Sequence, residues 1–129
     1  MNFTFIDGKV TTNTDFGALS ISPNAEIGNR PFELFISSLV GCSIPTLANI
    51  LVKRRLSYRQ INISTSAVRN PEMANRIEQI SIIAEVESDA EMSSELAKKI
   101  ADLVIKNCGM IQSVINSIEI SFEIVFSPK

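Results

Sequence analysis

Two cysteines, Cys42 and Cys108, are the residues of this chain best suited to chemistry. The sequence contains no histidine, so it lacks both the commonest general base and the commonest metal ligand. Without histidine, two cysteines cannot supply the usual four ligands of a zinc site within one chain. We therefore expect thiol chemistry without a metal or any other cofactor.

Cys42 lies in the densest apolar stretch of the sequence, which runs from Arg30 to Arg55. One interpretation is inert packing, because apolar burial raises the pKa of a thiol. The other is a reactive thiolate, which here only an arginine, a lysine or a helix N-terminus could stabilise. Arg30 is the candidate cation. Glu33 either orients Arg30 or stabilises the first turn of a helix.

Cys108 stands directly before Gly109 and a predicted short helix over residues 110–116. A cysteine at the start of a helix has its thiolate favoured by the helix dipole and by free N–H groups. This position indicates a reactive thiol, and the alternative is a small apolar side chain at a helix junction. A disulfide with Cys42 requires the two Cα atoms to lie within ~7 Å, which the sequence alone does not decide.

The N-terminal region predicts a small antiparallel sheet that precedes the cysteines. Asp7-Gly8 is a dipeptide typical of two-residue hairpin turns, so we expect strands at about residues 2–6 and 9–13. Residues 18–21 favour a third short strand. The turn-forming residues in the segment 22–30 indicate a loop.

A long helix is predicted to begin at Pro31, since proline suits the first helical position. From Phe32 to Val52 its apolar side chains face nearly all directions, as in a helix buried in a core or in lipid. The length is that of a membrane span, ~20 residues, but the polar side chains within it favour a protein core. Pro45 predicts either a kink that frees the carbonyl of Gly41 or a break between two helices.

The second half of the chain alternates between strands and helices. Residues 61–67 and 80–86 show the period of two that is typical of strands. Ser88 to Glu91 matches a capping box, which predicts the start of a helix. Residues 118–126 form the clearest alternating strand. The resulting order is an α+β pattern: hairpin or meander, long central helix, β-hairpin, helix pair and C-terminal strand.

Length and composition fit a single soluble domain over residues 1–129. Hydrophobic residues make up 45% of the chain and charged residues 20%, as in ordinary globular proteins. The formal net charge of -2 and the lack of a basic run with interleaved aromatics argue against nucleic-acid binding. The N-terminus shows no basic region followed by an apolar one, so we expect no signal peptide and a cytoplasmic location.

The sequence resembles the OsmC/Ohr family over about Arg30 to Val125, with a weaker hairpin before it. The motifs that carry this resemblance are Pro31-Phe32-Glu33-Leu34, Gly41-Cys42, Ala97-Lys98-Lys99-Ile100 and Lys106-Asn107-Cys108, together with the closing strand. The resemblance implies an OsmC-like α+β fold. It also implies an intertwined homodimer with the thiol pair at the subunit interface.

The resemblance further implies an activity. Well-known members reduce organic hydroperoxides, with the first cysteine attacking the peroxide and the second resolving the product. Carried over, Cys42 is the peroxidatic thiol and Cys108 the resolving thiol, recycled by a dithiol without metal or haem. The expected partners are a second copy of the chain, a small organic hydroperoxide and a dithiol reductant, with no nucleic acid and no membrane.

The sequence departs from those hydroperoxide-reducing members at three positions. Their helix-starting proline is followed by glutamate, whereas here Phe32 intervenes and the glutamate is Glu33, as in a broader branch of OsmC-like proteins. Their loop arginine has no counterpart before Arg30, and Gly109 stands where proline usually follows the second cysteine. At ~100° per residue, Glu33 and Cys42 face opposite sides of a regular helix.

These departures favour a second hypothesis, a binding module with unreactive thiols. Such a module holds a small apolar ligand in a pocket at the dimer interface. The expected lining consists of Phe32, Phe35, Ile36, Met110 and Ile111.

Overall fold

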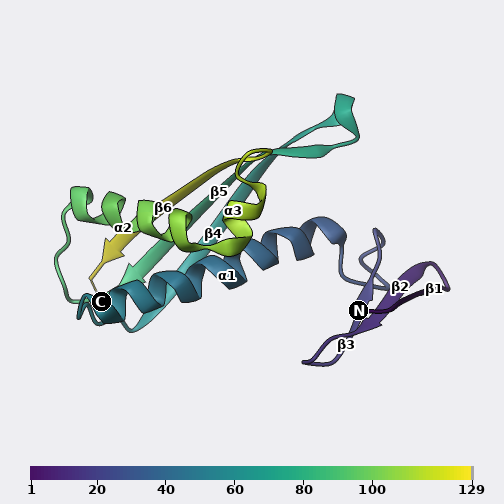
Figure 1. Ribbon diagram of the computed structural model, residues 1–129, viewed down its shortest axis with the longest axis horizontal. Coiled ribbons are helices and arrows are strands. Elements are labelled where there is room, and N and C mark those ends of the chain that lie inside the picture. Colours follow the sequence, from purple (N-terminus) through teal and green to yellow (C-terminus); the bar gives the residue numbers. More distant parts are fainter. Residues whose placement is uncertain (129) are drawn as a thin grey trace. The chain divides into compact units, whose positions relative to one another are not determined.

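The computed structural model describes residues 1–128 of the chain (Figure 1). The chain forms two compact units, Met1–Ser38 and Leu39–Lys129. Lys129, the last residue of the predicted domain, lies outside the described residues. Each unit holds one three-stranded sheet. Helices and sheets occur together in the order expected, so the predicted α+β class is confirmed.

The first unit is built on an antiparallel meander of three strands. They are β1 (Phe3–Ile6), β2 (Lys9–Asn13) and β3 (Ala18–Ile21), in the sheet order β1-β2-β3. Asp7 and Gly8 both have positive φ, 54° and 78°, which is the backbone geometry of a two-residue turn whose twist matches that of the strands. The predicted hairpin and the third strand are therefore confirmed.

Helix α1 (Pro31–Lys53) begins at the predicted proline and continues through Pro45. The predicted alternative of a break into two helices is therefore wrong. A helix tolerates proline where its other turns are held by packing, and here one stripe of side chains at a spacing of four is buried. That stripe consists of Leu39, Ser43, Leu47 and Leu51.

α1 is the one described helix that is long and apolar enough to cross a membrane, with a mean hydropathy of 1.8 in its most apolar window. The core helix of a soluble protein passes the same test. Only 22% of that window is buried within the chain.

The second unit contains a mixed sheet of three strands in the order β4-β5-β6. β4 (Gln60–Asn70) and β5 (Arg76–Glu87) form an antiparallel hairpin whose turn holds the 3-10 helix η1 (Pro71–Met73). β6 (Glu119–Ser127) runs parallel to β5. A parallel pair needs a crossover, which α2 (Ser94–Asn107) and α3 (Gly109–Val114) provide.

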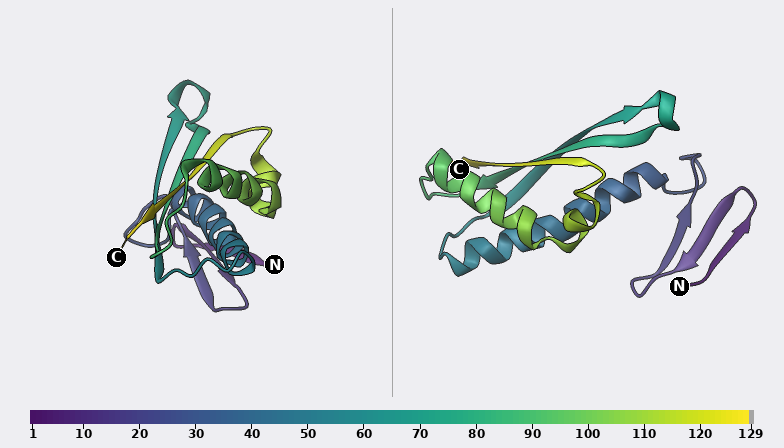
Figure 2. Two further views of the ribbon diagram at one scale, coloured as in Figure 1. Left: turned by 90° about the vertical axis from the view of Figure 1, so that its left-hand side faces the viewer. Right: turned by 45° about the horizontal axis from the view of Figure 1, so that its top comes forward.

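One face of this sheet is covered by helices. Figures 1 and 2 show α2 and the part of α1 from Leu39 onward on the same side of the sheet. The strands alternate accordingly, and the predicted inward face of β5 is confirmed. Its buried side chains are Ile80, Ile82, Ala84 and Val86. The helices and this face of the sheet together form the core of the second unit, which also contains the cysteines.

The predicted capping box at Ser88 is wrong, because α2 begins only at Ser94. The Ser88 hydroxyl instead donates to the carbonyl of Ser57 at 2.6 Å and accepts from the N–H of Ala90 at 3.1 Å. It therefore ties the end of β5 to the chain that leads into β4. Ser93 is the residue that caps α2, accepting from the N–H of Leu96 at 3.1 Å.

Replacing Ile82 with alanine should lower the free energy of unfolding by about 2–5 kcal/mol, because it empties a fully buried position on the central strand. Ile83 is 39% exposed on the opposite face of β5, so Ile83→Ala should cost less than about 1 kcal/mol. Urea denaturation followed by circular dichroism measures both values. Equal losses would contradict the assignment of the two faces.

Candidate functional site

The structure brings the two cysteines together within the second unit. Cys42 lies in the middle of α1, and Cys108 lies between α2 and α3. The thiol of Cys108 is hydrogen-bonded to the sulfur of Cys42, and both cysteines are free thiols. The contact between Cys42 and Cys108, which the sequence alone could not decide, is therefore present.

The backbone at Cys108 fixes the position of its side chain. Its N–H donates to the carbonyl of Val104 at 2.9 Å, which closes the last turn of α2. Its carbonyl accepts from the N–H of Gln112 at 2.9 Å, which opens α3. With φ −87° and ψ 112°, Cys108 is an extended residue between two helices. One residue thus ends one helix, starts the next and presents its sulfur to α1.

The two thiols differ in exposure. Cys108 is fully buried, whereas Cys42 is half-buried and reaches the surface of the unit. A small molecule that enters from solvent therefore meets the sulfur of Cys42 first.

Hydrogen bonds lower the pKa of Cys42. The largest effect comes from the backbone N–H of Met110, followed by the thiol of Cys108, and the N–H of Gly109 adds a smaller effect. Partial burial opposes them by disfavouring the charged form. All the groups that lower this pKa are uncharged donors, so a turn of backbone and a neighbouring thiol stabilise the thiolate.

Burial raises the pKa of Cys108, and the neighbouring Cys42 sulfur raises it further. The N–H groups of Ile111 and Met110 act in the opposite direction but do not outweigh burial. The predicted effect of the helix start on the Cys108 thiolate is therefore present, but burial outweighs it and the pKa of Cys108 is raised overall. The N–H of Met110 also acts on Cys42, and the Cys108 thiol donates a hydrogen bond to the Cys42 sulfur.

Arg30 and Glu33 belong to the first unit. The carbonyl of Arg30 accepts from the N–H of Leu34 at 3.0 Å, and Glu33 is an exposed acid in the first turn of α1. An acid at this position stabilises the start of the helix. The roles of Arg30 and Glu33 beside the thiols stay predictions.

The predicted apolar pocket draws on residues of both units and stays a prediction. Within the second unit, Ile111 is fully buried and Met110 is 42% exposed. Ile111 is therefore a core residue of α3, and Met110 is the member of the predicted lining that faces outward.

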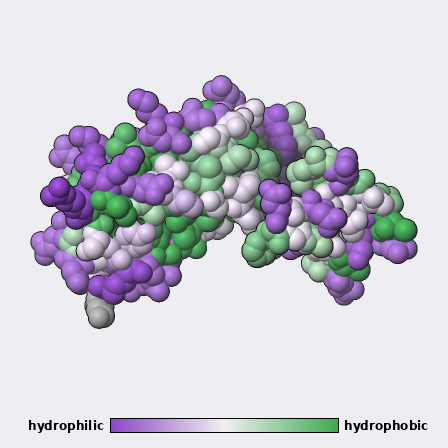
Figure 3. Space-filling view, turned by 60° about the horizontal axis from the view of Figure 1, so that its bottom comes forward, coloured by the Kyte–Doolittle hydropathy of each residue, from purple (hydrophilic) through white to green (hydrophobic). Residues whose placement is uncertain are grey.

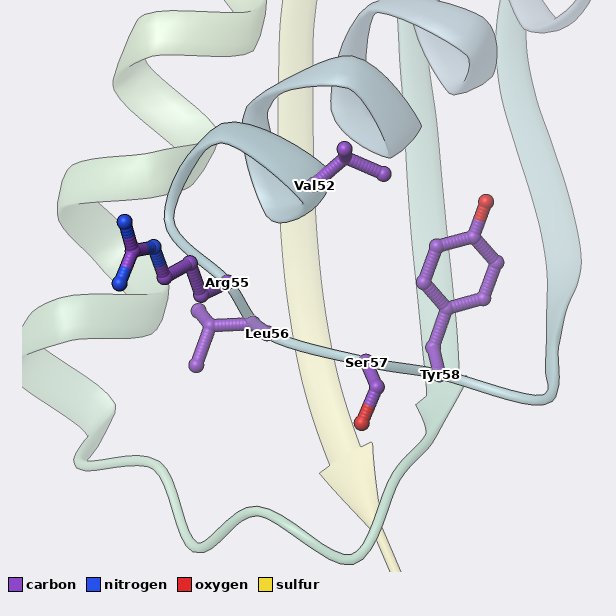
Figure 4. A pocket seen from close by; sticks show the side chains of 5 residues that line it. All are labelled: Val52, Arg55, Leu56, Ser57 and Tyr58. Atoms are coloured by element: carbon purple, nitrogen blue, oxygen red, sulfur yellow. The ribbon is translucent and has the colours of Figure 1, made fainter.

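Two hollows of the second unit lie away from the cysteines. Figure 4 shows one at the end of α1, with the side chains of Val52, Arg55, Leu56, Ser57 and Tyr58 around it. The other lies between α2 and β6 and is lined by residues such as Ala97, Ala101 and Phe122. Within residues 1–128, no group of three or more histidines, cysteines or acids is placed to hold a metal ion.

Two features of the site escaped the sequence reasoning. The first is the pair of backbone N–H groups of Gly109 and Met110 that face Cys42. The second is Ser43, whose fully buried hydroxyl makes no hydrogen bond with any residue from 1 to 128. The sequence carried a signal for the first, since Gly109 follows Cys108 where a helix begins. It carried none for the second.

Comparisons with protein families and with solved structures identify relatives of this chain. The sequence model of a family described as OsmC-like protein matches residues 23–123. A search of curated protein sequences found no match. Among solved structures, a hypothetical protein from Aquifex aeolicus VF5 has a TM-score of 0.84 at 18% identity, covering 99% of this chain and 95% of that one.

Two further structures carry more informative names. An OsmC-like protein from Mycoplasma pneumoniae has a TM-score of 0.77 at 16% identity, covering 98% of this chain and 95% of that one. The organic hydroperoxide resistance protein OhrB of Bacillus subtilis has a TM-score of 0.67 at 13% identity, covering 95% and 94%. At these identities the similarity is one of fold.

The fold and the site define a class: a mixed α+β protein in which a long helix meets a helix junction through two cysteines. The family match spans both cysteines and most of the chain, so this chain belongs to the OsmC-like family. The resemblance seen in the sequence is confirmed at the level of family and fold.

Iodoacetamide should alkylate Cys42 before Cys108, with a rate that rises through a midpoint below the ordinary thiol pKa. The thiolate is the nucleophile, and the lowered pKa of Cys42 means that more of it is ionised at neutral pH. Cys108, with its raised pKa, should react only at higher pH or after unfolding. Peptide mapping by mass spectrometry across roughly pH 6–10 measures both midpoints.

The control for this titration is the protein unfolded in urea. Both cysteines should then react with ordinary and similar midpoints, because the hydrogen bonds and the burial are lost. A midpoint for Cys42 in the folded protein at or above its unfolded value would contradict the described electrostatics.

Proposed function

We propose that this protein reduces organic hydroperoxides by thiol chemistry, with Cys42 as the attacking residue and Cys108 as the resolving residue. The observation that supports this is the polarised thiol pair: a half-buried Cys42 with a lowered pKa accepts a hydrogen bond from a buried Cys108 with a raised pKa. The family and the names of structural relatives such as OhrB support the proposed substrate class.

In the first step, the Cys42 thiolate attacks the distal oxygen of the hydroperoxide ROOH. The O–O bond breaks, Cys42 becomes a sulfenic acid, and the alkoxide leaves as ROH after taking up a proton. A lowered pKa provides the thiolate for this step at neutral pH.

In the second step, the sulfur of Cys108 attacks the sulfur of the Cys42 sulfenic acid. A disulfide forms and water leaves, carrying the sulfenic oxygen and the thiol proton of Cys108. This step brings the two sulfurs to an S–S distance of ~2.05 Å, and the Cys108 thiol already interacts with Cys42.

A dithiol then returns the protein to its starting state. One thiolate of the reductant attacks the disulfide, and its second thiol displaces the remaining protein thiol, so the reductant leaves as a disulfide. Because Cys108 is buried, we propose that the reductant attacks at Cys42. This cycle needs no metal and no haem.

We also propose that Arg30 and Glu33 complete the site, with Arg30 as a cation for the peroxide and Glu33 as its orienting partner. Both lie at the start of the same helix that carries Cys42. The support for these roles is the resemblance in sequence.

We propose that the functional form is a cytoplasmic homodimer, with α1 as a core helix and without membrane or nucleic-acid partners. Large apolar side chains are exposed on each unit, as Figure 3 shows in green. In β1, Phe3 is 56% exposed and Phe5 is 74% exposed, and at the end of α1 Val52 is 66% exposed. A second copy of the chain would cover such surfaces, which a monomer rarely leaves open.

Mixing the protein with a slight excess of cumene hydroperoxide should lower its intact mass by two hydrogens within seconds, as the disulfide forms. Cys42→Ser should show no change. Cys108→Ser should gain one oxygen, because its sulfenic acid cannot be resolved. Arg30→Ala should slow the reaction about tenfold if Arg30 supplies a charge-assisted contact. An unchanged wild-type mass with both thiols still titratable would sink the proposal.

Light scattering coupled to size exclusion should give a mass about twice the 14.2 kDa of one chain. Phe5→Asp should shift the equilibrium toward monomer, because it places a charge on the apolar surface of β1. Thr4→Asp is the matched control on the neighbouring position, which points to the other face of the strand. A monomeric wild type would contradict the dimer.

A further inference from the structure

We propose that Phe16 of one copy of the chain inserts into the hollow at the end of α1 of a second copy. The inference rests on the homodimer named under the proposed function, because it assigns one contact between the two copies. Two observations carry it. Phe16 is an aromatic side chain that the chain leaves fully exposed, and the hollow suits such a side chain in size and in charge.

Phe16 belongs to the turn between β2 and β3, and its side chain is fully exposed. Hydrogen bonds between Thr14 and Gly17 close this turn. Each N–H donates to the carbonyl of the other residue, at 2.8 Å and 3.1 Å, and the Thr14 hydroxyl donates to the carbonyl of Gly17 at 2.9 Å. An aromatic ring on an ordered turn loses little conformational freedom when it binds, and aromatic anchors dominate many protein interfaces.

The hollow at the end of α1 has a volume of about 360 Å³. That volume lies at the small end of the range for ligand pockets, ~300–1,000 Å³, and leaves room for one aromatic side chain. Val52, which is 66% exposed, forms an apolar wall together with Leu56 and the Tyr58 ring (Figure 4). A phenyl ring placed there would remove apolar surface from water on both copies.

Charge separates this fit from a general apolar contact. Asp15 directly precedes Phe16 and is exposed, and Arg55 is part of the lining of the hollow. Neither residue makes an ion pair with any residue from 1 to 128. When the ring of Phe16 enters the hollow, the neighbouring carboxylate comes close to the Arg55 guanidinium. Opposite charges then face each other across the interface, which favours this pairing over others.

The backbone of Arg55 supports a use for its side chain. Its N–H donates to the carbonyl of Val52 at 3.0 Å, and the N–H of Leu56 donates to the carbonyl of Leu51 at 2.9 Å. Many helices end with this hydrogen-bond pattern, usually on a glycine. Arg55 adopts a φ of 59°, which costs an arginine more free energy than a glycine. A contact of the guanidinium with a second copy would offset that cost.

Disulfide trapping tests the contact between copies. Phe16→Cys and Val52→Cys are combined in a full chain that also carries Cys42→Ser and Cys108→Ser, and the protein is oxidised with copper phenanthroline. A denaturing gel without reductant should show a species of about twice the 14.2 kDa of one chain. Each of the two cysteine substitutions alone should not cross-link. Phe16→Cys with Val68→Cys should not either, although Val68 is 53% exposed.

Two results of this trapping would overturn the proposal. One is a disulfide within a single chain, which lowers the mass by two hydrogens without doubling it. The other is no cross-link in a protein that light scattering shows to be dimeric, and it would leave the homodimer standing without this contact. A monomeric wild type would remove both. No hydroperoxide is involved, so failure of the peroxidase assay is a separate result.

Charge reversal tests the proposed ion pair. Asp15→Arg and Arg55→Asp should each raise the dissociation constant of the dimer about tenfold or more, because each brings like charges together at both copies of the contact. Aspartate tolerates a positive φ, so Arg55→Asp keeps the end of α1. The two changes in one chain should restore most of the lost affinity, measured by sedimentation over a dilution series. A double variant that shows no recovery would overturn the proposal.

Discussion

The hydrogen bond from the Cys108 thiol to the Cys42 sulfur is the contact on which the proposed chemistry depends. It joins a long helix to a helix junction, and each partner is held by backbone geometry. Cys42 lies on α1, the helix whose stripe of buried side chains packs in the core. Cys108 is fixed by the two hydrogen bonds through which it ends α2 and starts α3.

The same contact has opposite consequences for its two members. Burial at Cys108 penalises a charge, so that thiol keeps its proton and serves as a donor. At Cys42 the hydrogen-bond donors outweigh the burial penalty, so the pKa of that thiol is lowered. The two residues are chemically identical, so their opposite pKa shifts follow from the deeper burial of Cys108. Cys42 is therefore the thiol that combines a lowered pKa with exposure to solvent.

Much of the fold was predictable, because strand alternation and the Asp7-Gly8 turn are local signals. The start of α2 was not, since Ser88 holds a distant loop and leaves the capping role to Ser93. Pro45 left a kink or a break open from the sequence, and α1 continues through it. The two cysteines could be named from the sequence. Their contact, and the donors that lower the pKa of Cys42, required the burial and the amide directions that only the folded chain supplies.

The position of the two cysteines along the chain has a consequence for the folded state itself. A bond between residues 42 and 108 would enclose β4, β5 and α2 in one covalent ring. By loop entropy, such a ring would stabilise the protein by about 4 kcal/mol relative to the open chain. By linkage, the fold favours the oxidised pair to the same extent. The redox state of the thiols and the stability of the second unit would therefore be linked: oxidation would raise the free energy of unfolding and reduction would lower it.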